Sequence, residues 1–220
     1  VEVANGAGLR TSALVTDMNE PLASAAGNAL EVRSAVDFLT GRFRDPRLET
    51  VTLALAAEML QSAGLAETNQ NGVGRAAEAL ASGRAAATFG RMVAALGGPA
   101  DFVEKAENYL PKAPVELAVR ATANGFITGI ATRDIGLAVV TLGGGRSRPE
   151  DRIDHSVGIS RLLPVGAEAI AGEVLALVHA RTPAEAEKAA RAVFDAYSVG
   201  TSRPPAKKAV IRRISPRDGV

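Results

Sequence analysis

The chain has 220 residues, and its 25 Lys and Arg against 24 Asp and Glu give a formal net charge of +1. So balanced a charge creates no field that attracts polyanions, which argues against nucleic acid or an anionic membrane as a partner. The sequence has no cysteine, which excludes disulfides and thiolate metal sites and favours the cytoplasm. Hydrophobic residues make up 47% but aromatic residues only 4%, so we expect an aliphatic core. No apolar run approaches the roughly 20 residues of a membrane-spanning helix.

The stretch from Thr16 to Val32 organises the N-terminal part of the chain. Residues 12–16 are a β-like run, Pro21 holds a polar turn, and a helix is predicted to start with Asn28 as its cap. This is the strand, loop and helix unit in which α/β proteins place ligand loops. Residues 1–8 read as the last turn of a helix ended by glycine, which favours a chain taken from a longer protein.

Helices are predicted through the rest of this part. Pro46 after Asp45, and apolar residues spaced by three and four, predict a helix that ends at Gly64. The polar residues 67–74 are predicted to form a loop. Two alanine-rich helices are expected on either side of Gly83.

The composition changes near residue 111, where two prolines within four residues indicate a domain boundary. Beyond it, the alternating residues 115–121 and the run 126–130 flank Asn124-Gly125, a turn sequence, and are predicted to form a β-hairpin. A short helix capped by Asp134 is expected to end at Leu142.

The final third is predicted to contain further strands and one clear helix. Residues 165–178 are predicted to form a second hairpin. Thr182 followed by Pro183 predicts a helix start, with Thr182 as the cap. Residues 209–211 are predicted to be the last strand.

Gly143, Gly144, Gly145 and Arg146 invite comparison with a phosphate-binding loop. Glycine lets backbone N–H groups approach an anion, and arginine adds a charged fork. The strict P-loop pattern fails, because the segment lacks a Lys-Ser/Thr ending and follows a predicted helix rather than a strand. These four residues are a candidate lid or anion loop, with a plain connector as the alternative.

No other residues form a recognisable catalytic or metal-binding pattern. His155 and His179 have no Cys or carboxylate at ligand spacing, so we expect structural, hydrogen-bonded histidines. Residues 165–178 resemble the hairpin of biotinyl and lipoyl carrier domains. No lysine lies between Lys112 and Lys188 to carry such a cofactor, so a carrier function is not expected.

Several motifs occur along the chain in one order. They are Thr16–Asn19 with Pro21-Leu22, Gly27–Val32, Gly143–Arg146, Ile153-Asp154 and Val157–Ile159. Together they resemble the pyrimidine nucleoside phosphorylase family over essentially all 220 residues. The resemblance implies an α/β (α+β) fold: residues 1–110 would be part of a mixed-sheet α/β domain with its helices. Residues 111–220 would be a C-terminal α/β-hammerhead domain, similar to a barrel-sandwich.

The resemblance also implies phosphorolysis in pyrimidine salvage. Thymidine and phosphate would give thymine and 2-deoxyribose 1-phosphate, with phosphate as a co-substrate and no cofactor. In the family, the reactive residues lie upstream, in a Lys-His-Ser loop and a helical domain. We therefore assign no catalytic residue here and expect this chain alone to be inactive. Thymidine and uridine both stay open as the preferred substrate.

Partners and ions follow from the same resemblance. The complete protein would be a homodimer, and this chain would pair with the upstream half. A structural cation in the family uses carbonyls that match Leu22 and Ala25, and a glutamate whose position here holds Ser34. No metal is assigned. The alternative function is a non-catalytic scaffold that complements a separately made catalytic half.

Overall fold

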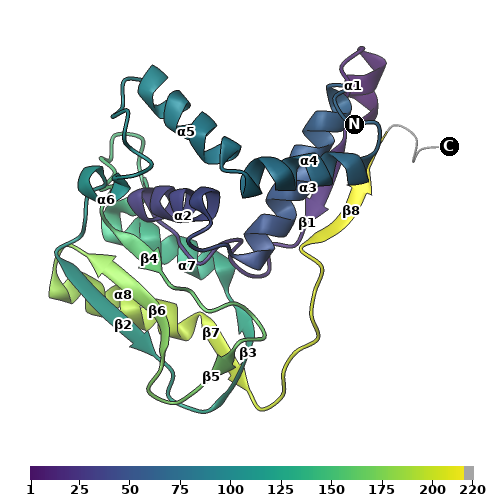
Figure 1. Ribbon diagram of the computed structural model, residues 1–220. Helices are drawn as coiled ribbons and strands as arrows, with labels where there is room; N and C mark the ends of the chain where they lie inside the picture. The colour runs from purple at the N-terminus through teal and green to yellow at the C-terminus, as the bar shows by residue number, and fades with distance from the viewer. Residues whose placement is uncertain (216–220) are drawn as a thin grey trace.

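The computed structural model describes residues 1–215. Within these residues, helices gather in one part of the molecule and most strands in another (Figure 1). The helices are α1 (Glu2–Gly6), α2 (Asn28–Thr40), α3 (Pro46–Ser62), α4 (Asn69–Ala81), α5 (Arg84–Ala95), α6 (Ala106–Tyr109), α7 (Thr132–Val139) and α8 (Pro183–Asp195). The strands are β1 (Ala13–Thr16), β2 (Val115–Arg120), β3 (Gly125–Ile130), β4 (Gly158–Ser160), β5 (Glu168–Ala169), β6 (Val174–Ala180), β7 (Tyr197–Gly200) and β8 (Val210–Ile214).

The helix starts predicted at Pro46 and Pro183 are confirmed. The Asp45 carboxylate accepts hydrogen bonds from the N–H of Arg47 at 3.0 Å and of Leu48 at 3.5 Å. The Thr182 hydroxyl accepts one from the N–H of Glu185 at 3.3 Å. Each side chain satisfies N–H groups that the first helical turn leaves unpaired, so local sequence fixes both helix starts.

The main core lies in the sheet-rich part. There the sheets β2-β6-β4 and β5-β3-β7, all of whose pairs are antiparallel, pack with α7 and α8. Ile127, Ile159 and Val178 are fully buried, so the core is aliphatic, as the composition predicts. A smaller cluster joins α2 to α6 and the segment before it through Val36, Phe102 and Ala106.

Both predicted hairpins were wrong, although their strands exist. Strand β2 pairs with β6, and β3 pairs with β5 and β7 instead of with β2. Strand β6 likewise pairs with β2 and β4, not with β5. The Asn124 side chain accepts a hydrogen bond from the N–H of Ala171 at 2.8 Å. Asn124 thus contacts a segment distant in the sequence instead of closing a hairpin turn, because burial of apolar faces between distant segments decides the pairing.

Three predicted caps or boundaries were also wrong. Gly27, not Asn28, is the N-cap of α2, in a conformation with φ 124°. Residues 69–74 belong to α4, whose cap is Thr68 and whose Gly72 packs closely on Ala57. Asp134 lies within the first turn of α7 rather than before it. The polar residues at the start of α4 favoured a loop in the sequence, but packing against α3 stabilises them as a helix.

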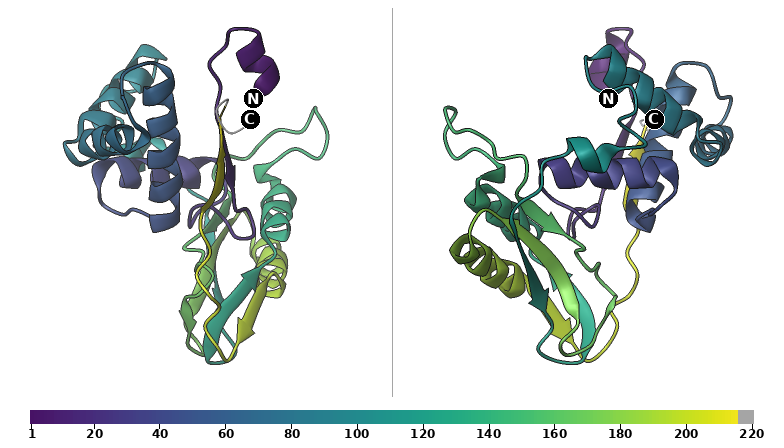
Figure 2. Two further views of the ribbon diagram at one scale, coloured as in Figure 1. Left: turned by 90° about the vertical axis from the view of Figure 1, so that its right-hand side faces the viewer. Right: turned by 60° about the vertical axis from the view of Figure 1, so that its left-hand side comes forward.

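The end of the described chain returns to its beginning. After β7 the chain crosses back to the helical part, where β8 pairs antiparallel with β1, Ala13 opposite Ile214 (Figures 1 and 2). The side chain of Glu58 on α3 holds this pair, accepting from Ser12 at 2.6 Å and from Arg213 at 2.6 and 3.1 Å. Strand β1, and with it the start of the loop that follows, is thereby held by β8 and by α3. Within residues 1–215, no helix is both long and apolar enough to cross a membrane.

Candidate functional site

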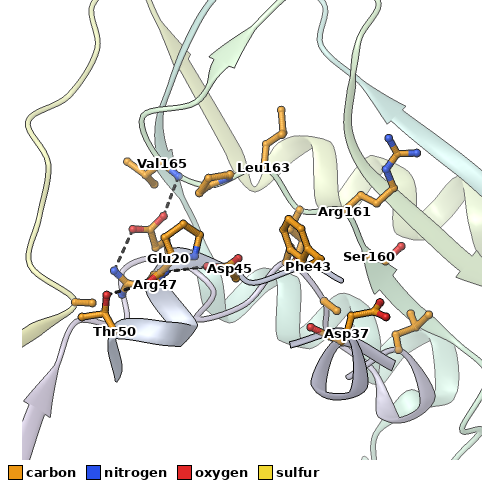
Figure 3. Close-up of a pocket in the computed structure, with 18 of the residues that line it drawn as sticks. Glu20, Asp37, Phe43, Asp45, Arg47, Thr50, Ser160, Arg161, Leu163 and Val165 are labelled. Carbon is orange, nitrogen blue, oxygen red and sulfur yellow. Dashed lines mark hydrogen bonds and ion pairs between the residues drawn. The ribbon is translucent and has the colours of Figure 1, made fainter. Parts of the chain in front are cut away.

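A cavity of about 1120 Å³ lies between the helical part and the sheet-rich part (Figure 3). Its walls are formed by the loop after β1, by α2 and the start of α3, by the stretch from β4 to Val165, by residues of β6, and by residues 207–210 at the start of β8. Phe43, which is 54% exposed, lies on one wall, and Arg161 lies on another. The cavity therefore has both apolar and cationic surface.

The loop after β1 is anchored by Arg47 from the first turn of α3. The Arg47 guanidinium contacts Glu20 at 3.1 Å, donates to the carbonyl oxygen of Asp17, and lies 3.6 Å from the Asp17 carboxylate. The second oxygen of Glu20 accepts from the N–H of Val165 at 2.8 Å, so one carboxylate joins both sides of the cavity (Figure 3). Burial raises the pKa of Asp17. Hydrogen bonds from Asn19 and the charge of Arg47 together lower this pKa by more, so it lies below its ordinary value.

Two glycines from the family motifs meet beside this loop. Ala26 and Ile159 exchange two backbone hydrogen bonds of 2.8 Å, which brings Gly27 against the backbone of Val157 and Gly158. A Cβ on Gly27 would lie 2.5 Å from the Val157 carbonyl oxygen, and one on Gly158 would lie 2.3 Å from that of Ala26. No side chain fits between these segments, so the motif around Gly27 and the motif around Gly158 meet in a single backbone contact.

His179, with Ser160 beside it, is a polar group in the cavity wall. Its Nε2 lies 2.7 Å from the Ser160 hydroxyl, and its Nδ1 lies 3.4 Å from the Glu116 carboxylate. Burial lowers the pKa of His179, Glu116 raises it, and the nearby positive charge of Arg33 lowers it; the net shift is downward. The lowered pKa keeps His179 neutral near pH 7. Its hydrogen bond to Ser160 confirms that it is hydrogen-bonded, as the sequence predicted.

The structure does not bring Gly143–Arg146 to this cavity. A helical turn continues α7 as far as Leu142 and is broken at Gly143, whose backbone is not helical, so the helix end predicted at Leu142 is confirmed. Gly143 has φ 90°, and its carbonyl oxygen accepts from the N–H of Asp154 at 2.9 Å. The segment opens a projecting loop (Figure 2). Its role as a lid or anion loop stays a prediction.

The positions matched to a family cation site lie in or near the cavity. Ala25 and Ser34 are in its walls, whereas Leu22 is not. Within residues 1–215, no three or more His, Cys, Asp or Glu side chains gather in a way that could hold a metal. His155 is exposed, and its carbonyl oxygen accepts from the N–H of Ala29 at 3.0 Å.

Sequence reasoning missed the two side-chain groups that shape the cavity. Arg47 looks like any charged residue of a helical first turn, and no local pattern links it to Asp17 or Glu20. Ser160 and His179 come together because β4 pairs with β6. Only knowledge of the strand pairing could have found them.

Comparison with known proteins shows similarity along nearly the whole chain. Residues 1–86 match the family model "Glycosyl transferase family, a/b domain", and residues 126–200 match "Pyrimidine nucleoside phosphorylase C-terminal domain". The chain is 72% identical over 217 residues to a thymidine phosphorylase of Mesorhizobium japonicum. It is 49% identical over 214 residues to that of Rhizobium meliloti and 47% identical over 215 residues to that of Agrobacterium fabrum.

These alignments cover 97% to 99% of this chain but 49% of each relative. The chain thus spans about half the length of the curated relatives it matches. The motifs from Thr16 to Ile159 fall within the matched residues. The chain is thus similar over nearly its whole length to thymidine phosphorylases, and its residues 126–200 match the C-terminal domain of pyrimidine nucleoside phosphorylases.

Proposed function

We propose that this chain forms part of a thymidine phosphorylase, which converts thymidine and phosphate to thymine and 2-deoxyribose 1-phosphate. The observation that carries the proposal is the 72% identity over 217 residues to a thymidine phosphorylase of which the chain spans 49%. The loop from Asp17 to Gly27 would form a floor beside the nucleoside and phosphate cleft. The reactive residues would come from the half of the protein that this chain lacks, where they would orient phosphate and stabilise charge.

The surface of the helical part supports a role within a larger protein. Large apolar side chains are exposed along α3 and α5 and on the turns that end them. They are Leu55, Met59, Leu65, Met92 and Leu96, each 48% to 81% exposed. Large apolar side chains exposed on neighbouring helices and turns are typical of faces that another segment or subunit covers. We therefore propose the other half of the same protein as the partner.

The proposal extends to the setting of the complete enzyme. It would be a cytoplasmic homodimer that uses phosphate as a co-substrate and needs no cofactor. The absence of cysteine from the sequence supports the cytoplasm, since it fits a reducing compartment.

The test measures thymine release from thymidine and phosphate with the purified 220-residue chain. We expect no release from the chain alone, and release once it is co-expressed with a polypeptide that supplies the other half of the relatives. Uridine is assayed in parallel to identify the preferred pyrimidine. Thymine release by the chain alone would show that the reactive residues lie within it. An inactive co-purified complex would refute the assignment to a thymidine phosphorylase.

A further inference from the structure

Three polar side chains lie on neighbouring strands of one sheet: Ser160 on β4, His179 on β6 and Glu116 on β2. His179 is directly opposite Glu116 on one side and Gly158 on the other. Residues two apart on a strand face the same side, so Ser160 shares the face of Gly158. Because Gly158 has no side chain, the imidazole can reach the hydroxyl diagonally across the pair.

The surroundings of His179 fix which of its nitrogens carries the proton. Burial keeps the ring neutral, since it lowers the pKa of His179, and a neutral imidazole has one N–H. The Glu116 carboxylate only accepts hydrogen bonds and lies 3.4 Å from Nδ1, so the proton belongs on Nδ1. Nε2 is then an acceptor for the Ser160 hydroxyl at 2.7 Å. This is the order of a serine, a base hydrogen-bonded to it and a carboxylate close to the other nitrogen of the base.

The cavity supplies room and a positive charge for a reactant. Ser160 and His179 both line it, and the residue after the serine, Arg161, does so too (Figure 3). Arg161 is the one non-glycine residue with positive φ, 55°, within residues 1–215. Strained backbone of this kind gathers at functional sites. In the described part of the chain the Arg161 guanidinium has no ion-pair partner, so it leaves the cavity wall with an uncompensated positive charge.

We propose that Ser160 and His179 form a second reactive centre, a nucleophile and its base for hydrolysis of small carboxylic esters, with Glu116 as the positioning residue. Ser160 Oγ attacks the carbonyl carbon while its proton moves to His179 Nε2. The bond to the alkoxy group breaks, and the alcohol leaves with that proton. Water, deprotonated by His179, attacks the acyl-serine; the acid leaves and Ser160 regains its proton. The centre lies wholly within this chain and is independent of phosphorolysis.

Covalent labelling of the 220-residue chain with a fluorophosphonate tests the nucleophile. We expect one phosphonyl group per chain, located on Ser160 by peptide mass spectrometry, and none in Ser160→Ala. His179→Gln should slow labelling by about a hundredfold or more, the usual contribution of a general base. Ser34→Ala, in the same cavity wall but without a histidine partner, should label like the parent chain. A chain that is not labelled at Ser160, or a His179→Gln variant that labels at the parent rate, would overturn the proposal.

The absence of cysteine from the sequence allows a second test that does not depend on the ester. A thiol beside a histidine loses its proton more readily, and the thiolate is the reactive form. Ser160→Cys should therefore react with iodoacetamide at pH 7 at least about tenfold faster than Ser34→Cys, and His179→Gln should remove the difference. Equal rates for the two cysteine variants would contradict a base at His179.

Glu116 is tested by the pH dependence of labelling. Two charged groups act on His179: the Glu116 carboxylate raises its pKa, and Arg33 on α2 lowers it. Glu116→Gln should shift the midpoint of the labelling rate to lower pH while one group per chain is still added. A loss of structure alone would reduce the labelled fraction without moving the midpoint. A midpoint that stays in place would refute the positioning role.

Discussion

At the scale of single residues, Gly27 and Gly158 make a close backbone contact between two distant segments. Each would bring a Cβ within 2.5 Å of a carbonyl oxygen on the other segment, and Gly27 also has φ 124°. The sequence shows both glycines but gives no sign that they touch, because residues 27 and 158 are brought together only by the bridge from Ala26 to Ile159. A position whose constraint is tertiary looks like an ordinary turn or strand residue when read locally.

Gly27→Ala should destabilise the chain by at least about 2 kcal/mol more than Gly172→Ala. Both glycines have positive φ, but a Cβ on Gly172 would meet nothing within 4 Å, so the difference isolates the clash with Val157. Urea unfolding followed by circular dichroism measures both variants. Equal destabilisation would mean that the segments move apart at little cost.

Glu58 is a second residue whose role is tertiary. Burial raises its pKa, but hydrogen bonds from Arg213 and Ser12 lower it more, so the pKa lies below its ordinary value. The unfolded state therefore binds more protons than the folded state in acid. The stability from this group is complete above the ordinary pKa of 4.5 and is lost as the pH falls through the lower, folded value.

Glu58→Gln should lower the free energy of unfolding at pH 7 by about 1–3 kcal/mol, because hydrogen bonds to charged groups are lost. It should also flatten the fall in stability below pH 4.5, which urea unfolding at several pH values would detect. Glu67→Gln, at an exposed glutamate, is the control and should change neither quantity. An unchanged pH dependence in Glu58→Gln would assign the acid sensitivity to other carboxylates.

At the scale of elements, helices and strands differ in how far the sequence determines them. The helix starts at Pro46 and Pro183 follow from side chains within a few residues, and the structure confirms both. The prediction of strand pairing was wrong because local sequence does not distinguish one apolar strand from another as a partner. The choice of partner depends on which faces of the strands α7 and α8 cover. The prediction of a loop at the start of α4 was wrong for a related reason, since packing against α3 stabilises this turn of the helix.

Thr182→Ala should cost about 1 kcal/mol of stability, because the N–H of Glu185 loses its acceptor at the start of α8. Thr182→Ser keeps the hydroxyl and should retain most of that stability. Thermal unfolding of the two variants beside the parent chain measures the difference. If serine and alanine were equally destabilising, the lost methyl packing rather than the cap would be responsible.

At the scale of the whole molecule, the cavity lies between parts that are built differently. One wall is the loop after β1, which Arg47 fixes, and the other is the β4 strand with the residues that follow it. The family resemblance identified that loop correctly as a motif. The cavity, the Glu20 link to Val165 and the pair Ser160 with His179 all depend on how the two parts meet, and no local pattern specifies this.

Removal of residues 210–220 should release β1 while leaving the sheet-rich part folded. The main core lies among β2 to β7 and helices α7 and α8, which the deletion does not touch. Hydrogen exchange should show lost protection at Ala13–Thr16 and retained protection in β6. Exchange that rises equally in β6 would instead mean that the two parts unfold together.

The return of β8 to β1 also sets an order of events during synthesis. Ala13 is synthesised long before its partner Ile214, because the two residues are far apart in the sequence. A two-stranded pair is marginal even when complete, so β1 has no lasting structure until β8 has been synthesised. The helices and the sheet-rich part can collapse first, whereas the loop from Asp17 to Gly27 waits for the final strand. The cavity wall that carries the family motif is therefore the last part of this chain to mature.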